Sequence, residues 1–513
     1  MDRVLFMLPH LSSSSGFLTL CFLFVTAAFL LLGCRRRSGD GRAAAILRNL
    51  VTQVLTTTRV SDRQSTRRRG LSIQVTDRAV AHRALVQHSA SFLDRPTGAV
   101  PSTILTRNKH FNILSAPYGP YWRAVRRNVS AGVLHPSRLR LLGDTRARVL
   151  GDLVRALGSG APAGETLHFA VYSVLAEMCF GQDVVSEVIG ETRLRAMQKF
   201  QREILLALPS FGVFVRYPRI GRLIYPSRWR QLLALRRQQE ESFLPLVDEV
   251  RKKRRNHDSE FTTYVESLLD LRVHEDGDRA VTDGEVVSLI SEFLGAGTES
   301  TAAALEWTMA NLVKHPQVQQ KLRAEVDAVV ASSGLIRIQE EDLARMPYLK
   351  AVVLESLRRH PPVPFVLRHV KGGDDAAKAL GVPCLPDGGA TVNFLVGKIS
   401  RDPAAWSEPT SFKPERFLPG GEAEEAADLT CTRELRMMPF GAGRRVCPGL
   451  AAAMLHLEYL VANLVREFEW CEPDGDEEVD LAEFRGFFFT VMNRPLRARV
   501  VPRGRGCVGA CVL

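Results

Sequence analysis

Three things are scarce in this chain of 513 residues: paired cysteines, charge near the amino end, and proline in the first hundred residues. The nine cysteines are scattered without paired spacing, which argues against a disulfide framework and favours free thiols in a reducing compartment. No proline occurs between Pro9 and Pro96, which excludes a proline-rich hinge in that interval. No internal repeat is apparent.

Charge is missing from Leu11 to Cys34, and the most apolar part, Gly16 to Gly33, is about long enough to cross a bilayer core. The segment before it carries only Asp2 and Arg3 as charges, so the basic start of a cleaved signal peptide is absent. Three arginines, Arg35 to Arg37, follow at once, and by the positive-inside rule they stay in the cytosol. We therefore predict an uncleaved membrane anchor over residues 1–34.

The net charge of +12 raises the question of a nucleic-acid partner, because a basic patch is the electrostatic footprint of phosphate binding. The charge is clustered at Arg35 to Arg37, Arg67 to Arg69 and Arg251 to Arg255, and no nucleic-acid motif accompanies it. Membrane headgroups suit the first two clusters, and an exposed loop or helix end suits the third. We predict a membrane partner and no nucleic acid.

The segment 440–449 carries the most chemical information, because it surrounds one thiol, that of Cys447, with glycine, arginine and proline. Pro448 has its ring-fixed φ where a helix would begin, and Leu450 to Phe468 has apolar residues at helical spacing. A helix N-terminus stabilises a thiolate through its partial positive charge. The alternative is a buried structural cysteine in a glycine-rich turn.

The whole pattern Phe-x-x-Gly-x-Arg-x-Cys-x-Gly resembles the haem-binding signature of the cytochrome P450 family. The resemblance implies haem b with its iron axially ligated by Cys447. It also implies that Phe440 packs against the ligand loop and that Arg445 reaches a haem propionate. Gly443 and Gly449 would let the chain pass close to the macrocycle.

Further motifs of the family occur in the family's order. The pair Glu355 and Arg358 resembles the Glu-x-x-Arg of helix K, and Arg416 lies in an element that resembles Pro-x-Arg-Phe. In the family these three charges form a buried network behind the haem, so we predict a structural role; the alternative for the first two is an ordinary solvated pair. Trp122 and Arg126 match the Trp-x-x-x-Arg of helix C, which implies that both approach a propionate.

The stretch after Pro361 and Pro362 resembles a strand, Val363 to Val370, that passes the macrocycle. Related sequences have Arg or His at the position of His369, and we carry it over as a propionate partner. A solvated basic residue is the alternative there, and for Arg126 and Arg445 as well.

A long helix is expected from Thr282 to His315, opened by a capping box of Thr282 with Glu285. Its middle, Ala296 to Thr301, resembles the family's helix I motif, where a local break in backbone pairing opens a groove for oxygen and water. Glu299 would then be the acid and Ser300 the alcohol that together supply protons to the reaction with O2. Serine in place of threonine departs from the family, and the alternative is that this hydroxyl bonds back to a helix carbonyl.

The amino-terminal region also departs from the family, whose microsomal members usually have a proline-rich hinge there. Residues 35–70 are instead rich in Arg, Ser and Thr, so we predict a basic linker of uncertain structure, followed by a strand at Leu71 to Val75. Length alone suggests about three domains. The motifs belong to one architecture, so we predict a single catalytic domain over residues 71–502 and a disordered tail over residues 503–513.

The combined prediction is a mainly α fold with a small β-rich lobe, the cytochrome P450 fold, with haem between helix I, which begins at Thr282, and helix L after Cys447. The resemblance is greatest to plant microsomal members. It implies a monooxygenase that inserts one oxygen atom from O2 into a hydrophobic organic substrate, with electrons from NADPH delivered by NADPH-cytochrome P450 reductase. The enzyme would be a single-pass protein of the endoplasmic reticulum membrane with its catalytic domain in the cytosol.

Two alternatives remain open from the sequence. A haem-thiolate isomerase or dehydratase would use the same fold on peroxides, but such members tend to lack the acid and alcohol that Glu299 and Ser300 supply. A noncatalytic membrane-tethered protein is the second alternative, and failure to bind haem would favour it.

Overall fold

The computed structural model describes residues 71–96, 101–107, 109–254, 262–333, 337–423, 428–485 and 488–503. The predicted anchor over residues 1–34, the linker over residues 35–70 and nearly all of the predicted tail lie outside these ranges. Among the described residues, no helix combines the length and the hydropathy that a membrane span needs.

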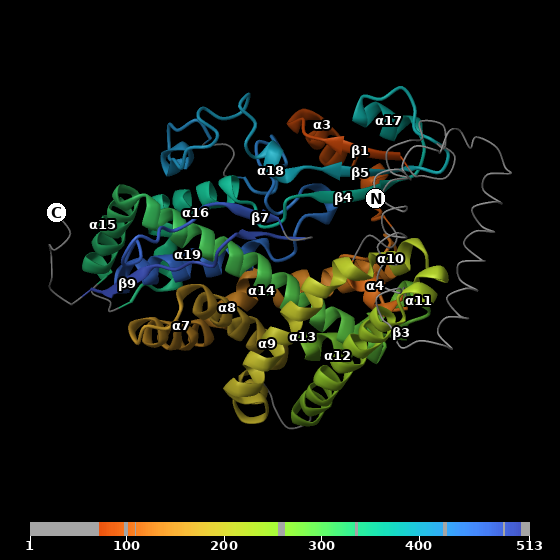
Figure 1. Ribbon diagram of the computed structural model, residues 1–513, viewed down its shortest axis with the longest axis horizontal. Coiled ribbons are helices and arrows are strands. Elements are labelled where there is room, and N and C mark those ends of the chain that lie inside the picture. The colour runs from red at the N-terminus through yellow and green to blue at the C-terminus, as the bar shows by residue number, and fades with distance from the viewer. Residues whose placement is uncertain are drawn as a thin grey trace, which may run out of the picture. The chain divides into compact units, whose positions relative to one another are not determined.

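Helices make up most of the described chain (Figure 1). They are α3 (Arg78–His82), α4 (Pro101–Thr106), α5 (Pro120–Arg127), α6 (Pro136–Arg140), α7 (Gly143–Gly158), α8 (Ala163–Phe180), α9 (Gly190–Ala207), α10 (Gly212–Arg216), α11 (Ile220–Ile224), α12 (Pro226–Lys253), α13 (Tyr264–Asp270), α14 (Asp283–Lys314), α15 (Pro316–Ser333), α16 (Pro347–Arg359), α17 (Asp374–Leu380), α18 (Val396–Ile399) and α19 (Leu450–Glu467).

The strands are short. They are β1 (Leu71–Val75), β2 (Arg272–Val273), β3 (Arg279–Ala280), β4 (Val366–Val370), β5 (Ala390–Phe394), β6 (Phe468–Cys471), β7 (Glu483–Arg485), β8 (Thr490–Met492) and β9 (Arg499–Pro502). A three-stranded sheet has the order β1-β5-β4, and the other described pairs are β2-β3, β6-β9 and β7-β8.

The three-stranded sheet joins distant parts of the sequence. Strand β1 occupies the predicted range and runs parallel to β5, with Leu71 opposite Ala390, whereas β4 is antiparallel to β5. Strand β4 begins at Val366, later than predicted, because Pro364 cannot donate a ladder hydrogen bond. With α3 and α17 beside it, this sheet forms the small β-rich lobe at the top of Figure 1.

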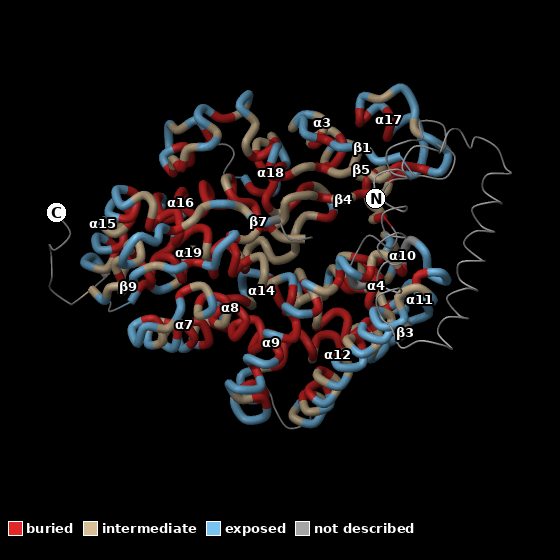
Figure 2. The backbone as a smooth tube through the Cα atoms, viewed as in Figure 1, coloured by how far each residue is buried: buried red, intermediate tan, exposed pale blue. Residues whose placement is uncertain are grey.

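Helix α14 crosses the middle of the molecule and packs against α8, α16 and α19 (Figure 1). The predicted capping box is confirmed, since Thr282 caps the helix with Glu285 as its partner. Inner turns of α8, α16 and α19 are buried around it (Figure 2). The helix therefore has buried neighbours along much of its length, which explains its run of apolar residues.

The predicted break in the middle of this helix is absent, because α14 is continuous from Asp283 to Lys314. The packing of α14 against α8 explains why residue 297 is glycine. A Cβ atom at that residue would lie 2.9 Å from Cδ1 of Leu175 on α8, so glycine lets the two helices approach closely. The glycine in the motif thus serves contact between helices in this structure.

A partly buried ion pair attaches the hairpin β7-β8 to Arg401 and to His360 at the end of α16. Glu483 on β7 accepts hydrogen bonds from Arg401 at 2.6 Å and from His360 at 3.2 Å. The His360 ring stacks on the indole of Trp307 at 3.9 Å between centroids. Burial would raise the pKa of Glu483, but the two basic partners outweigh it and hold the pKa at about 2.

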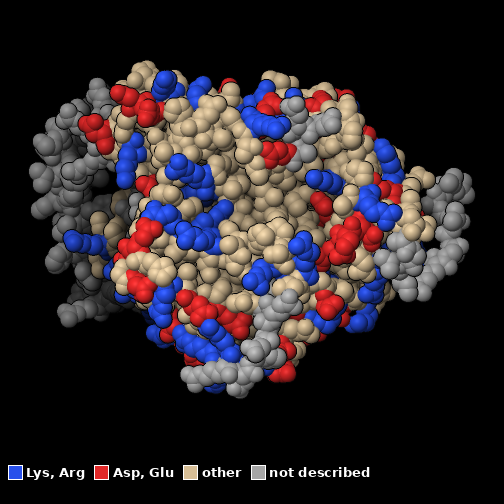
Figure 3. Space-filling model, turned by 180° about the vertical axis from the view of Figure 1, so that it is seen from behind, with Lys and Arg blue, Asp and Glu red and all other residues tan. Residues whose placement is uncertain are grey.

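Charged side chains are mixed on the face of the molecule seen in Figure 3, where Lys and Arg alternate with Asp and Glu around a central uncharged area. Ion pairs between exposed side chains also occur in the described residues, such as Arg251 with Asp248 and Asp283. Pairs of this kind contribute little to stability, at most about 1 kcal/mol each.

Candidate active site

One cavity of about 420 Å³ lies between α14 and α19 and is also lined by α5, β4 and the segment 438–449. Ala296, Gly297 and Ser300 of α14 line it, and Cys447 lines it from the segment before α19. Among the described residues, no other cysteine reaches the cavity. Helices α14 and α19 are the predicted helix I and helix L. They therefore enclose the space that is predicted to hold the haem.

The segment that carries Cys447 is held by its own backbone. The backbone N–H of Cys447 donates to the carbonyl of Phe440 at 2.9 Å, and Phe440 also lines the cavity. Gly449 is the N-cap of α19, its backbone N–H bonds to the sulfur of Cys447, and a Cβ atom there would lie 3.8 Å from that sulfur. The thiol thus lies at a helix N-terminus, where the helix dipole favours negative charge.

Burial raises the pKa of the Cys447 thiol, against the lowering effects of the Gly449 N–H and the charge of Arg126. The protein alone therefore favours the neutral thiol. A metal cation at the sulfur deprotonates a coordinating thiol outright. A thiolate at Cys447 thus depends on the metal ion that it would bind.

Glycine is required at Gly443 because of the backbone of Leu85, whereas the macrocycle was predicted to require it. Its φ is +72°, and a Cβ atom there would lie 1.8 Å from the carbonyl oxygen of Leu85, in the helical segment Arg83–Gln87. Gly443 does not line the cavity, whereas Gly441, with φ of +73°, does. The close approach at Gly443 is to the backbone of that segment, so its predicted contact with haem has no support in the geometry.

The predicted Trp122 and Arg445 lie against each other beside the cavity. The guanidinium carbon of Arg445 is 4.7 Å from the centre of the Trp122 ring, and its Nη2 donates to the carbonyl of Ala116 at 2.7 Å. The indole N–H of Trp122 donates to the carbonyl of Ile113 at 3.1 Å. These contacts fix both side chains before any ligand binds.

Five arginines line the cavity: Arg236 of α12, and a group of four made up of Arg95, Arg126, Arg368 and Arg445. Burial lowers the pKa of each of these four arginines. For Arg95, Arg368 and Arg445, the positive charge of a neighbouring arginine lowers the pKa further. The pKa is about 10 for Arg95 and for Arg445. The Nε atoms of Arg95 and Arg445 are buried and have no acceptor among the described residues. Such an excess of buried positive charge requires an anion.

The two propionate carboxylates of haem fit this requirement, and the thiol of Cys447 lines the same cavity. Carboxylates accept bidentate hydrogen bonds from guanidinium groups. The residues present therefore fit a haem group, with its acidic edge among the arginines and its metal at the sulfur.

His369 was predicted to contact a propionate, but the structure does not place it in the cavity. Its ring lies next to Gly389, where a Cβ atom would be 3.2 Å from Cε1 of the ring, and its backbone N–H donates to the carbonyl of Asp94. The preceding residue, Arg368, lines the cavity instead and is almost fully buried. The two-residue alternation of a strand places Arg368 on the same face as the apolar Val366 and Val370, and this is the sequence signal that could have identified it; the structure buries all three.

Glu292 of α14 was not predicted, and it lines the cavity close to the arginines. Its carboxylate accepts the backbone N–H groups of Ile113 at 2.8 Å and Leu114 at 2.6 Å. Burial raises the pKa of Glu292 to about 7, although these two hydrogen bonds and the charges of Arg95 and Arg126 lower it. An acid in an apolar helix stretch, one helix turn before Ala296, is the sequence signal for this residue.

The predicted alcohol, Ser300, and the predicted acid, Glu299, have different surroundings. Ser300 lines the cavity, and its hydroxyl donates to the carbonyl of Ala296 at 2.7 Å, which is the alternative that the sequence left open. Glu299 does not line the cavity. Its Oε2 lies 3.3 Å from Nε2 of His168 on α8, and Nδ1 of the same ring bonds to the amide of Gln198 on α9.

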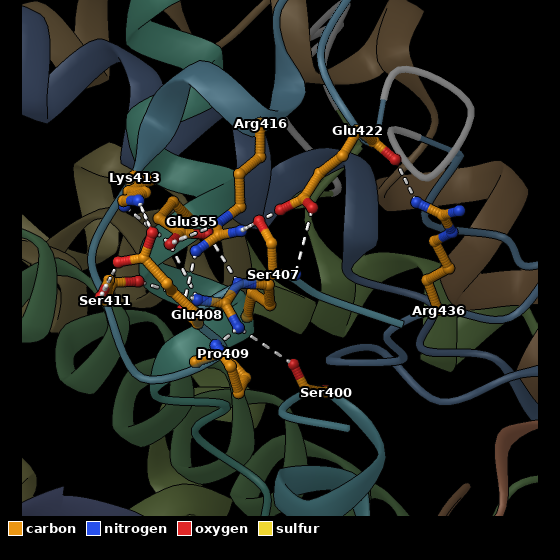
Figure 4. Close-up of polar contacts among 11 residues, drawn as sticks. Glu355, Ser400, Ser407, Glu408, Pro409, Ser411, Lys413, Arg416, Glu422 and Arg436 are labelled. Atoms are coloured by element: carbon orange, nitrogen blue, oxygen red, sulfur yellow. Dashed lines mark hydrogen bonds and ion pairs between the residues drawn. The ribbon is translucent and has the colours of Figure 1, made fainter. Parts of the chain in front are cut away.

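The predicted network of Glu355, Arg358 and Arg416 is assembled in the structure (Figure 4). Arg358 donates to Glu355 with Nε at 2.6 Å and Nη2 at 2.8 Å, and Nε of Arg416 lies 3.4 Å from the same carboxylate. The backbone N–H of Lys413 is a further donor at 2.8 Å. All three charged side chains are buried, so the alternative of a solvated pair is wrong.

The family model described as cytochrome P450 matches residues 71–499 of the chain. The chain belongs to the cytochrome P450 family. The mainly α fold with a small β-rich lobe is thus confirmed as the cytochrome P450 fold.

Plant cytochromes P450 are among the similar curated proteins. The chain is 42% identical to cytochrome P450 89A9 of Arabidopsis thaliana over 446 residues, which cover 84% of each chain. It is 34% identical to cytochrome P450 78A1 of Zea mays, over 80% of this chain and 75% of that one. Flavonoid 3'-monooxygenase of Arabidopsis thaliana is 28% identical over 80% of this chain and 79% of its own.

Solved structures share the fold. A zebra fish cytochrome P450 solved with progesterone has a TM-score of 0.67 and 23% sequence identity, over 85% of this chain and 94% of its own. This cytochrome P450 is accordingly a haem-dependent monooxygenase with cysteine-thiolate ligation of the iron. It uses O2, a small-molecule substrate and a redox partner.

Proposed function

We propose that this cytochrome P450 is anchored in the endoplasmic reticulum membrane by residues 1–34, with its catalytic domain in the cytosol. It receives NADPH electrons from cytochrome P450 reductase and inserts one oxygen atom into an organic substrate with a large hydrophobic part. The observation that carries the proposal is the cavity, which is largely apolar but has in its wall one thiol, that of Cys447, and the group of four arginines Arg95, Arg126, Arg368 and Arg445.

Cys447 would hold the haem iron, and Arg95, Arg126, Arg368 and Arg445 would hold the propionates. A haem with thiolate ligation supplies the electron density that favours O–O cleavage. Trp122 keeps Arg445 in position by stacking on it. Phe440 and Gly449 keep the sulfur in position through the backbone contacts of the ligand loop.

Ser300 and Glu299 would move protons to the reacting oxygen. The Ser300 hydroxyl, while it donates to Ala296, leaves its oxygen lone pairs toward the cavity as acceptors for water. Glu299 lies outside the cavity lining, with its carboxylate next to His168, so it must change rotamer or act through water to exchange a proton with Ser300. The apolar lining around Ala296 and Ala304 limits the entry of water.

The buried network of Glu355, Arg358 and Arg416 would stabilise the fold behind the haem. It connects α16 to the segment around Pro414–Phe417 and to carbonyls at Ser400, Pro409 and Ser411. Its role is structural, because none of its three charged residues lines the cavity.

A carbon monoxide difference spectrum of the reduced full-length protein tests the haem ligand. We expect a thiolate-type Soret band in the wild type and in Cys179→Ala, whose thiol is buried away from the cavity. Cys447→Ala should lack the band. A band that survives in Cys447→Ala would contradict the proposed ligand.

The electron source and the anchor need separate measurements. NADPH oxidation that depends on added cytochrome P450 reductase supports the proposed electron source, and turnover of peroxides without NADPH would contradict it. Deletion of residues 1–34 should release the protein from a microsomal membrane fraction. Protein that stays fully membrane-bound at high salt after that deletion would contradict the proposed anchor.

A further inference from the structure

A buried polar network forms part of the cavity wall where α9, α12 and α14 meet. Its members all line the cavity: Gln201, Arg236, Gln239, Ser288 and Ser291. Arg236 is 8% exposed and Gln239 1% exposed, so the network lies inside the molecule. The hydrophobic substrate predicted from the family resemblance does not account for it.

The network is held in one geometry by its own hydrogen bonds. Nη1 of Arg236 donates to Oε1 of Gln239 at 2.6 Å and to the Ser288 hydroxyl at 3.2 Å. The amide of Gln239 donates to the Ser291 hydroxyl at 2.6 Å, and Gln201 exchanges hydrogen bonds with the same hydroxyl. The side chains are therefore fixed before a ligand enters.

Donor capacity remains after these bonds are counted. A guanidinium has five N–H groups, and those of Arg236 are used by Glu240, Gln239, Ser288 and the carbonyl of Gly284. Within the described ranges, one N–H of Arg236 has no acceptor, and one of the two amide N–H groups of Gln239 has none either. A group that accepts hydrogen bonds from the cavity side would complete the network.

Burial of this network has a cost that apolar packing between the same helices would avoid. Desolvation of an arginine and two glutamines is unfavourable unless their hydrogen bonds replace those with water. Burial already lowers the pKa of Arg236, and in the part of the chain that the structure describes Glu240 is the one carboxylate paired with it. A purely hydrocarbon ligand would leave the remaining N–H groups without an acceptor.

The network lies at a defined distance from the reactive part of the cavity. Ser288 and Ser291 precede Gly297 by nine and six residues on the same helix. At 1.5 Å per residue, the offset along the axis is roughly 9–14 Å. The wall between them is apolar at Phe293 of α14 and Leu205 of α9, and Glu292 is the ionisable residue of α14 within this interval.

We propose that the substrate of this site is amphipathic. Its apolar part lies against Ala296 and Gly297, where oxidation occurs, and a hydrogen-bond-accepting oxygen group (hydroxyl, carbonyl or carboxylate) binds to Arg236 and Gln239. This inference rests on the proposed function and deepens it, because it replaces a generally hydrophobic substrate by one with a polar end at a fixed distance.

Binding of matched probes to the haem-loaded full-length protein tests the inference, with the dissociation constant taken from the shift of the Soret band. The probes are decane, decan-1-ol and decanoate, which share one chain length and differ at one end. We expect the alcohol or the acid to bind more tightly than decane. Gln239→Leu should weaken the oxygenated probes about threefold to tenfold, as for the loss of one hydrogen bond. Gln201→Leu removes a partner of Ser291 and should weaken the same probes to a smaller extent. Both variants should leave decane unchanged or tighter.

Leu205→Ala is the matched control on the same wall, and it should weaken all three probes to a similar extent. The inference is overturned if decane binds best to the wild type, if the two glutamine variants weaken all probes equally, or if no probe shifts the Soret band. The carbon monoxide band of each protein is recorded first. A wild type without that band refutes the proposed function, whereas an intact band with one of the three results above refutes only the amphipathic substrate.

Discussion

Replacement of Glu355 by glutamine should destabilise the fold strongly, because it leaves a buried guanidinium without its counter-ion. The Glu355 carboxylate is fully buried and accepts hydrogen bonds from Arg358, Arg416 and the backbone of Lys413. Arg416 also pairs with Glu422 and so keeps one carboxylate. Among the described residues, Arg358 then keeps no carboxylate; its remaining contacts are the carbonyls of Ser400, Pro409 and Ser411 and the ring of Trp406.

The expected loss of unfolding free energy is that of one uncompensated buried charge, the guanidinium of Arg358. Removal of one partner of a buried ion pair costs about 3–5 kcal/mol, so Glu355→Gln should lower the free energy of unfolding by that amount. The measurement is a guanidinium titration of the haem-loaded protein followed by circular dichroism. The fraction of protein that keeps the carbon monoxide band should fall in parallel.

Asp152→Asn is the matched control, because Asp152 and Arg155 form a pair with the same spacing as Glu355 and Arg358 but with both side chains more than half exposed. That pair should contribute at most about 1 kcal/mol. Equal and small effects of the two variants would refute the reasoning. In the double variant Glu355→Leu with Arg358→Leu, much of the loss should be recovered, since no unpaired charge remains on Arg358.

Three other predictions follow from single contacts. Gly443→Ala should lower the free energy of unfolding by about 2–5 kcal/mol, since the new Cβ would overlap the carbonyl of Leu85. The control is Gly160→Ala, where φ is +85° but the surrounding space is open, and it should lower the free energy of unfolding by only about 1–3 kcal/mol. Equal costs for the two variants would contradict the contact between Gly443 and Leu85. The pKa of Glu483, about 2, is below its ordinary value of 4.5, so its ion pair contributes stability above pH 4.5 that is lost as the pH falls toward 2. The stability difference between wild type and Glu483→Gln should therefore shrink over that range, and a constant difference would exclude this linkage. Ser300→Thr restrains the hydroxyl rotamer and should raise the ratio of product to hydrogen peroxide, by roughly twofold or less; an unchanged ratio would show that looseness at Ser300 does not limit coupling.

Local sequence signals predicted individual elements well. Strand β1 and the capped start of α14 depend on neighbours within a few residues, and both were predicted where the structure has them. The charged network around Glu355 was also predicted, because a one-turn spacing brings two of its members together and a family motif supplies the third.

Contacts between distant segments could not be predicted in the same way. Arg95 and Arg368 reach the cavity from a loop and a strand that are far apart in sequence, and neither matches a motif that the sequence analysis used. The partner of Glu299 is His168, which lies on another helix, so no spacing within α14 reveals it. Gly297 looks the same in sequence whether it allows a bend or the close approach of Leu175.

The parallel pairing of β1 with β5 sets an order for synthesis at the ribosome. Leu71 can pair with Ala390 only after Ala390 has been synthesised, which is 319 residues later. At about 5–20 residues per second, that interval is roughly 15–65 s. During it the strand has no permanent partner, and an unpaired strand edge is prone to aggregate. Chaperones that bind this nascent segment would therefore have most effect before the last quarter of the chain is made.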